Sequence, residues 1–347
     1  MAYNTITANE FVDNVERTVL EQLKDSKPNL VRSLFSSVPW NPGDGEKVTF
    51  NSIALSGFAP RVVENDNYSV VNPSKGNELS KTQIQFGDKL QITRRMMKFN
   101  NRYARAKFDA QDLVGRLKAS LDLEMTMQAF AEADVTTFTP LGALSAYNIA
   151  TSDGQALAST AHVYGGVTFS NILNNATQAG GLGPVLSIGN LTSAITAMGQ
   201  NTPDDFGTNL SVSPDTIVIA NNQHMIVKCH QMFGSSLTPE SANNAVNYYG
   251  GTGQFKVVAL NYGHSTPTGT VNTTAATTNM NRWMVADSRL TARSWQLMMA
   301  EEPTTEQKFV SEDNVIASIL VTQFASYGIV QPQGTMYSLS ITQPTLS

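Results

Sequence analysis

The longest helical pattern in the chain, over residues 109–134, constrains the fold more than any other feature of the sequence. Its apolar residues recur with a period of about 3.6 residues, so they lie on one face of the helix. They are Ala110, Leu113, Val114, Leu117, Leu121 and Met125. Asp109 is available to cap the N-terminus. A helix of this length extends for about 39 Å, which suits a backbone running across a flat subunit.

A second constraint comes from residues 46–100, which are predicted to form a long extended hairpin. Alternating apolar residues lead out from residue 47, a polar and turn-rich stretch occupies 65–80, and residues 82–93 lead back. The segment holds too few large apolar residues for a core of its own, and a two-stranded ribbon is marginal alone in water. We therefore expect the hairpin to lie on another surface, most simply that of a second copy of the chain.

The remaining segments combine helices and strands, so the predicted fold class is α+β. An amphipathic helix is expected over residues 8–25, and short strands and loops over 135–190. Helix patterns at 191–199 and 221–233 and strand patterns at 215–220, 254–260 and 282–286 predict an α/β unit. Two or three strands finish the chain. The expected divisions are an N-terminal arm (1–45), the hairpin (46–100), a domain around the long helix (101–186), the α/β domain (187–285) and a return to the helical domain (286–347).

Basic residues are crowded into the first third of the chain. Residues 1–118 hold 17 of the 23 Lys and Arg and 13 of the 28 Asp and Glu, a formal charge of 17 − 13 = +4. The remaining residues carry 6 − 15 = −9. This asymmetry suits contact between the basic part of one copy and the acidic part of another.

The stretch 94–107 contains basic residues around Phe99 and Tyr103 and no acidic residue. Such a stretch can stack on bases and clamp phosphates, so DNA stays open as a partner. We favour a protein partner because the rest of the molecule is acidic. The predicted intersubunit contacts are Arg94, Arg95, Lys98, Arg102 and Arg105, with Lys75, Lys81 and Lys89 of the hairpin.

The motifs that mark common enzymes are missing from the sequence. It contains no Walker loop, no Gly-x-Gly-x-x-Gly turn, no His-Glu-x-x-His pair and no Gly-x-Ser-x-Gly elbow. His224 and His230 are six residues apart, about 240° around a helix, so they do not face one metal ion. The single cysteine, Cys229, excludes an internal disulfide framework. No catalytic, cofactor or metal site is predicted, and the chain is not expected to be an enzyme.

Charge and hydropathy limit the partners further. A net charge of −5 and a pI near 5.4 argue against general nucleic-acid binding. No window approaches the ~20 apolar residues of a membrane span. Residues 1–30 contain five acidic residues and no continuous apolar stretch, so they do not form a secretory signal. We expect a protein that stays in the cytoplasm where it is made and has no membrane partner.

A family resemblance rests on the order of these elements and on one segment. The run Ser152–Leu157, followed by Ala161-His162 and Phe169–Asn171, is similar to a segment of Mu-type head subunits. The whole chain resembles the major capsid protein of tailed bacteriophages, which has the Hong Kong 97-type fold. This resemblance implies an N-arm, an E-loop (46–100), a P-domain with a spine helix (109–134) and an A-domain (187–285).

The resemblance implies a function in assembly. Many copies would form the pentamers and hexamers of an icosahedral shell around double-stranded DNA, and the shell would be part of a virion made in the bacterial cytoplasm. A separate scaffolding protein and a portal are expected as partners, a decoration protein is a further candidate, and contact with DNA is expected to be weak and nonspecific. The alternatives are an encapsulin-type nanocompartment shell and a soluble hydrolase whose site forms only in space.

Overall fold

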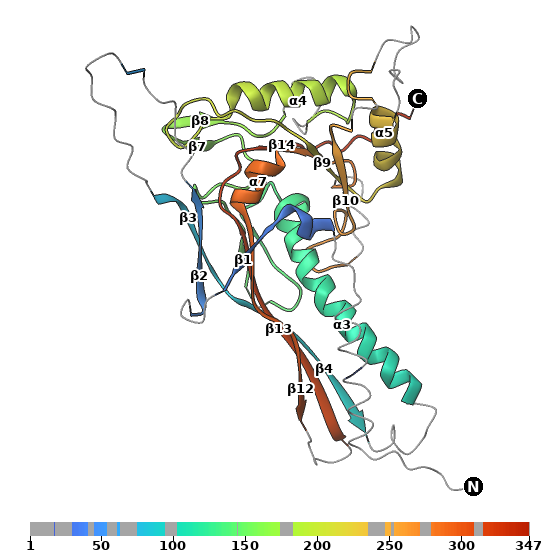
Figure 1. Cartoon of the computed structure of the whole chain (residues 1–347). Helices are drawn as coiled ribbons and strands as arrows, with labels where there is room; N and C mark the ends of the chain where they lie inside the picture. The colour runs from blue at the N-terminus through green and yellow to red at the C-terminus, as the bar shows by residue number, and fades with distance from the viewer. Residues whose placement is uncertain are drawn as a thin grey trace.

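In the residues that it describes, the structure, a computed structural model, combines one long helix, several short helices and two four-stranded sheets in an elongated body (Figure 1). The expected α+β class is therefore confirmed. The described residues are 17, 30–40, 45–53, 61–62, 75–93, 103–143, 145–173, 183–234, 247–250, 253–270, 279–308 and 315–346. Of the helix predicted over 8–25, they include only Arg17, which is helical.

The long helix α3 (Tyr103–Thr126) continues into a π-helical turn, η3 (Met127–Ala131), and forms the spine of the body. The predicted apolar face is buried, with Leu113 5% and Leu121 0% exposed. The helix begins six residues before the predicted start at 109, because the Ala, Arg and Lys residues ahead of that point are good helix formers. It ends where the Glu132 N–H donates to the Met127 carbonyl oxygen at 2.9 Å, five residues back rather than four.

The first sheet runs alongside α3 in the strand order β1-β12-β13-β4. Its centre is the antiparallel pair of β12 (Trp295–Lys308) and β13 (Val315–Ile329). On one side β1 (Ser36–Pro39) runs parallel to β12, and on the other β4 (Ile84–Thr93) runs antiparallel to β13. Side chains of α3 and of this sheet share one core. Helix and sheet thus form a single slab.

The pairing of β4 corrects the predicted course of the hairpin over 46–100. Residues 82–93 do not run back beside residues 47–53 as expected, because most of them form β4 and pair with β13 of the same chain. Phe86 belongs to the core under α3, and Ile84 packs against that core. Alternation gives β4 an apolar face. Pairing with β13 places that face against α3, where it is buried more completely than in a free ribbon.

The hairpin proper consists of β2 (Lys47–Ile53) and β3 (Lys75–Thr82), which pair antiparallel. Val48 and Phe50 are each 1% exposed and pack in a small core with Met298 and Val330. For these strands the surface that the hairpin needs is supplied by their own chain, and contact with a second copy stays a prediction. Alternation gives the hairpin one apolar face, and that face is sufficient for docking beside β12 and β13.

The second sheet lies at one end of the body, in the order β10-β9-β11-β14. Its strands are β9 (Thr216–Ala220), β10 (Lys256–Leu260), β11 (Trp283–Ala286) and β14 (Thr335–Ser338). Helices α4 (Ile188–Asn201) and α5 (Gln223–Gly234) contribute to a separate core with these strands. The helices and strands expected between 187 and 285 are confirmed, with ends within three residues of those predicted.

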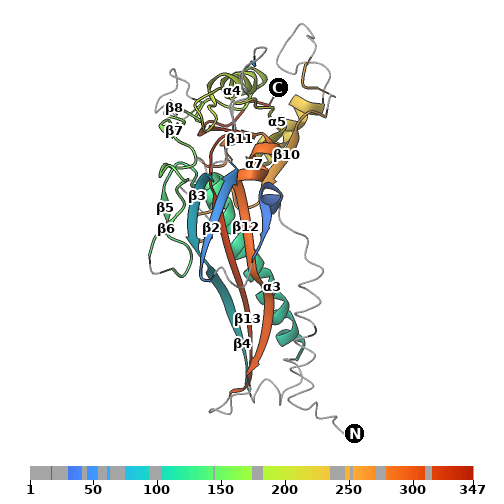
Figure 2. The same ribbon diagram turned by 60° about the vertical axis from the view of Figure 1, so that its left-hand side comes forward.

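Short elements join the two layers. Helix α7 (Ser288–Ser294), which the sequence patterns do not indicate, links β11 to β12, and the Asp287 carboxylate caps its N-terminus. η1 (Leu30–Leu34) packs against α3, β10 and α7. The other short elements are β5 (Thr137–Phe138), β6 (Tyr147–Asn148), β7 (His162–Tyr164) and β8 (Val167–Phe169). The turned view in Figure 2 shows α3 alongside β12 and β13, with α4 and α5 at the far end of the body. None of the described helices is long and apolar enough to cross a membrane.

Candidate functional site

The structure describes the side chains of two of the eight predicted contact residues. Arg94, Arg95, Lys98 and Arg102 lie outside the described residues. For Arg105 in α3 and Lys75 in β3 the structure describes the backbone alone. Lys89 is exposed on β4, as an intersubunit contact requires. The neighbouring Asp88 forms an ion pair with Arg116 of α3 at 2.9 Å. The role of the basic stretch therefore stays a prediction.

Lys81 differs from the prediction, because its side chain points into its own chain. The residue is 6% exposed, and its Nζ donates to the Asn148 carbonyl oxygen at 2.5 Å. The ammonium group also lies 5.4 Å from the centre of the Tyr147 ring, within reach of a cation–π contact. Burial lowers the pKa of Lys81 to about 8. A surface lysine of a polar hairpin was the expected role, but the buried position makes Lys81 part of an internal contact.

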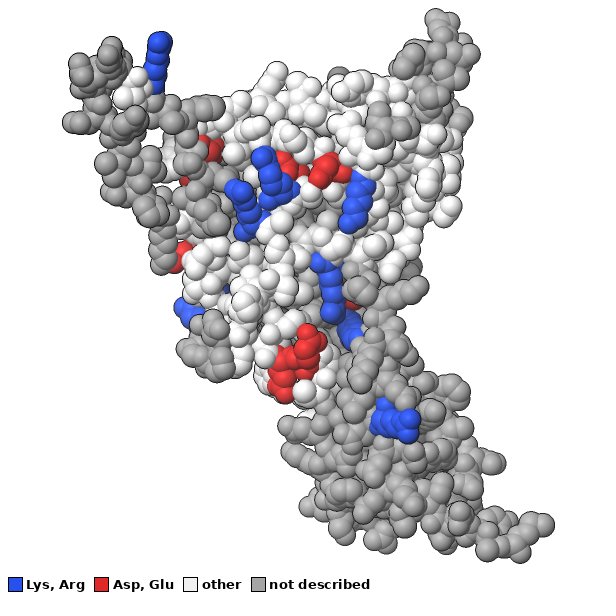
Figure 3. Space-filling view, viewed as in Figure 1, with Lys and Arg blue, Asp and Glu red and all other residues white. Residues whose placement is uncertain are grey.

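On the face drawn in Figure 3, the described residues carry their charges in small groups. Figure 3 shows Lys and Arg beside Asp and Glu on the face seen in Figure 1. Ion pairs within the chain include Arg32 with Asp122 at 2.6 Å and Arg282 with Asp134 at 2.8 Å. On this face, the described part of the chain forms no continuous basic tract of the kind that binds DNA.

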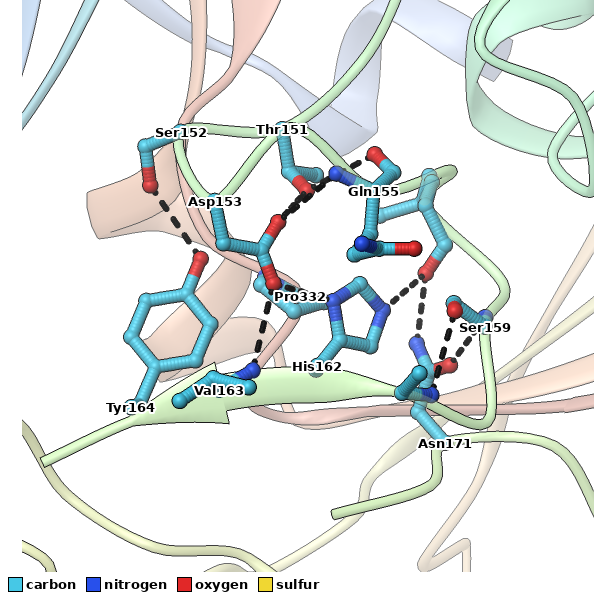
Figure 4. Close-up of polar contacts among 12 residues, drawn as sticks. Thr151, Ser152, Asp153, Gln155, Ser159, His162, Val163, Tyr164, Asn171 and Pro332 are labelled. Atoms are coloured by element: carbon cyan, nitrogen blue, oxygen red, sulfur yellow. Dashed lines mark hydrogen bonds and ion pairs between the residues drawn. The ribbon is translucent and has the colours of Figure 1, made fainter. Parts of the chain in front are cut away.

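The segment that carries the family resemblance folds into one buried polar cluster (Figure 4). The His162 ring is 0% exposed and lies between two acceptors. Its Nδ1 is 2.8 Å from an Asp153 carboxylate oxygen, and its Nε2 is 3.2 Å from the Leu157 carbonyl oxygen. Both ring nitrogens therefore have a hydrogen-bond partner inside the protein. Asp153 also accepts from the Thr151 hydroxyl at 2.6 Å. The cluster therefore ties strand β7 to the loop before it.

The same cluster reaches the C-terminal strand. Asn171 donates from its side chain to the Leu157 carbonyl oxygen at 2.7 Å, and its own carbonyl oxygen accepts from the Tyr337 N–H of β14 at 2.8 Å. The Ser152 N–H donates to the Val330 carbonyl oxygen at 3.0 Å. Val330 follows β13 of the first sheet, and Tyr337 lies in β14 of the second sheet. The chain therefore crosses from one sheet to the other between these two hydrogen bonds. The cluster thus holds the segment that connects the two four-stranded sheets, called here the joint.

The electrostatics of this cluster indicate a structural role. Burial alone would raise the pKa of the Asp153 carboxyl group, but hydrogen bonds from His162, Thr151 and the Gln155 N–H lower it below its ordinary value. A general base needs a ring nitrogen within reach of a substrate proton, and both nitrogens of His162 are engaged and shielded from solvent. The hydrolase alternative therefore finds no support in this Asp–His pair.

A second buried acid, Glu124, belongs to the spine helix α3 itself. The Oε2 atom of Glu124 accepts from the Tyr327 hydroxyl group at 2.9 Å, and burial raises the pKa of Glu124 to about 7. Glu124 helps to line a cleft of about 800 Å³ between α3, β4 and two loops, with Tyr147 and Tyr262 also on its wall. No group of three or more potential metal ligands occurs among the described residues. Helical periodicity marks position 124 only as part of α3, so the sequence carried no signal for this acid.

Comparison with known proteins connects the fold to solved structures alone. No protein-family model matches the chain. No curated protein matches it either.

Several solved structures are similar to the chain over most of its length. The capsid structure of Cyanophage P-SCSP1u is 13% identical, with a TM-score of 0.49, and the match covers 90% of this chain and 88% of that one. The mature capsid of bacteriophage PhiM1 is 10% identical, with a TM-score of 0.49 and coverage of 90% and 87%. A virus-like particle from Pyrococcus furiosus is 11% identical, with a TM-score of 0.43 and coverage of 94% and 97%.

Proposed function

We propose that this chain is the major capsid protein of a tailed bacteriophage, a subunit that assembles in many copies into an icosahedral shell around double-stranded DNA. The observation that carries the proposal is the division of the molecule. A spine helix and a long sheet form a slab, a second sheet with its own core lies at one end, and a two-stranded hairpin is docked on the slab. The order of these parts along the chain is the order that the family resemblance implies.

This shape favours an assembling subunit over a monomer. The slab, the second sheet and the hairpin offer different surfaces, and contacts between unlike surfaces generate rings when the rotation closes. Closed rings of five and six copies are the units of an icosahedral shell. A subunit with several such contacts buries more area than the roughly 1,200–2,000 Å² of a standard pairwise interface. The role is structural and needs no active site.

The partners follow from this role. The basic residues Arg94, Arg95, Lys98, Arg102 and Arg105 are proposed to meet acidic surface of neighbouring copies, and Lys89 is exposed for the same purpose. A separate scaffolding protein would guide closure, and a portal would occupy one vertex. The virion is the proposed location, after synthesis in the host cytoplasm. Contact with packaged DNA would be weak, because the chain carries a net charge of −5.

Electron microscopy tests the proposal directly. The chain is expressed in a bacterium, alone and with a candidate scaffolding protein, and the purified material is imaged. Closed particles of regular diameter are the expected result. A monodisperse monomer under both conditions would contradict the proposal. Closed shells from the chain alone would support the capsid function and contradict the need for a separate scaffold.

A further inference from the structure

The hairpin presents a face of mixed chemistry to the body. Val48 and Lys81 are cross-strand partners, as are Phe50 and Leu79, and alternation puts all four side chains on one face. Three of these side chains are apolar and take part in the small core beside β12 and β13. The fourth is a lysine that is 6% exposed, so a charge is buried where a fourth apolar residue would be expected.

The lysine contacts a different part of the body from its apolar neighbours. Val48 and Phe50 pack with Met298 of β12 and with Val330, which follows β13. Lys81 instead donates to the Asn148 carbonyl oxygen and lies over the Tyr147 ring, and both of these residues form β6. The charged contact of Lys81 with β6 is therefore separate from the apolar packing of the hairpin on Met298 and Val330.

These two kinds of contact constrain the hairpin differently. Apolar packing is non-directional and tolerates small tilts of one surface on another. A hydrogen bond from an ammonium group depends on distance and angle, and it is stronger than a bond between neutral groups. Two further side-chain hydrogen bonds between the hairpin and the body have neutral donors: Asn77 to Asp205 at 3.1 Å and Gln296 to the Asn51 carbonyl oxygen at 3.0 Å. Neither is fully buried.

We propose that Lys81 is a positioning residue, whose buried ammonium group fixes the direction in which the β2–β3 hairpin leaves the body before a second copy is met. This inference deepens the proposed function and rests on it, because a preset hairpin matters most for a subunit that has to meet neighbours at fixed angles. Burying the ammonium group costs desolvation, as the lowered pKa of Lys81 indicates. An apolar side chain at position 81 would pack without this cost. It would lack the directed hydrogen bond that the Lys81 ammonium group makes to β6.

The first test uses the unaltered chain. Unassembled protein is treated at pH 8 with N-acetoxysuccinimide, an amine-acylating reagent, and the modified lysines are identified by mass spectrometry of peptides. Lys81 is expected to stay unmodified while Lys89, which is exposed, is modified. Acylation of Lys81 as rapid as that of Lys89 would overturn the proposal, whatever happens in shell assembly.

The second test compares Lys81→Met with the matched control Lys89→Met by hydrogen exchange of the unassembled chain. Methionine is unbranched like lysine and one atom shorter, and it removes the charge and the donor. We expect amides of β2 and β3 in Lys81→Met to exchange about tenfold faster, the factor that one charged hydrogen bond supports, while β9 and β11 are unchanged. Lys89→Met is expected to match the wild type throughout. Unchanged exchange in β2 and β3, or equal acceleration in every element, would overturn a positioning role.

A third test asks whether the contact of Lys81 with β6 affects shell formation. Lys81→Met is expected to give fewer closed shells and a wider spread of diameters than the control Lys256→Met, which removes an exposed lysine of β10 that is not among the proposed contacts. If the wild-type chain forms no shells, the proposed function fails, and the exchange experiment still decides the role of Lys81. If the wild type forms shells and Lys81→Met forms them equally well, the direction set by Lys81 has no part in assembly, and the inference fails while the proposed function stands.

Discussion

The Glu124 carboxylate accepts a hydrogen bond from the Tyr327 hydroxyl group at 2.9 Å, in a buried position between the spine helix α3 and strand β13. Burial raises the pKa of Glu124 from 4.5 to about 7. The folded chain therefore binds this proton more tightly than the unfolded chain does. Its contribution to the free energy of unfolding falls as the pH rises from about 4.5 to about 7, by at most about 3 kcal/mol.

Replacing this acid should remove that pH dependence. Glu124→Gln resembles the protonated acid and keeps an oxygen that can accept from Tyr327. We expect the variant to match the wild type near pH 4.5 and to exceed its unfolding free energy at pH 8, by up to about 3 kcal/mol. Denaturant unfolding of the unassembled chain at both pH values measures the difference. The exposed Glu302→Gln is the control, and equal pH dependence in Glu124→Gln and wild type would contradict this account.

The buried Asp153–His162 pair should contribute strongly to stability. His162→Ala leaves the Asp153 carboxylate and the Leu157 carbonyl oxygen without their ring partner in a site closed to water. The expected loss is about 1–3 kcal/mol, the cost of leaving buried polar groups without a hydrogen-bond partner. The exposed His230→Ala is the control and should change stability by less than about 0.5 kcal/mol. A similar small change in His162→Ala would show that the cluster does not brace the joint.

Two glycines should respond in opposite directions to a methyl group. A Cβ at Gly328 of β13 would lie 3.0 Å from the Phe50 ring and 3.1 Å from a Leu79 methyl carbon. Gly328→Ala should therefore overpack the base of the hairpin and destabilise the chain by about 1–3 kcal/mol. Gly115 lies in α3 with no atom within 4 Å of such a Cβ, so Gly115→Ala should stabilise it by about 0.5–1 kcal/mol. Thermal unfolding measures both, and a stabilising Gly328→Ala would contradict the docked hairpin.

The thiol of Cys229 should be unreactive in the folded chain. The side chain is 1% exposed in the core beneath α5, and burial raises its pKa to about 12. Since the thiolate is the reactive form, a thiol reagent at pH 8 should label the folded chain slowly and the denatured chain at once. Spectrophotometric titration with a disulfide reagent follows both rates. Rapid labelling without denaturant would mean that α5 opens readily.

Neutralising the basic stretch tests the assembly contacts. Arg94→Gln combined with Arg95→Gln should leave the unassembled chain folded, as circular dichroism checks, and should reduce closed shells to background. The matched control removes two other surface cations, Arg289 and Arg293 of α7, by substitution with Gln. Normal shells from the Arg94 and Arg95 variant would refute the proposed contacts. Tight DNA binding that this variant loses would favour the DNA alternative instead.

Local elements could be predicted from the sequence because the spacing of apolar residues in each helix or strand shows which of its sides is buried. The apolar period around Leu113 and Leu121 indicated the spine helix, and compact apolar runs indicated β9 and β11. The partner of each face could not be predicted. Strand β4 has the alternation of a hairpin return, yet it pairs with β13, more than 200 residues further along the chain. Periodicity shows that a face is buried, and it does not show what buries it.

The candidate sites divide in the same way. Composition and missing motifs predicted a chain with assembly surfaces in place of an active site, and the segment around Asp153 and His162 was singled out before its contacts were known. The alternation of β3 puts Lys81 on the same face as Leu79, which is a sequence signal that its side chain is buried. The signal was missed because a lysine is ordinarily exposed. The sequence by itself therefore determined the elements and their buried faces, through side-chain periodicity and turn chemistry. Only the tertiary structure decided that β4 joins the main sheet and that Lys81 is buried, because both depend on which distant surfaces meet and exclude water.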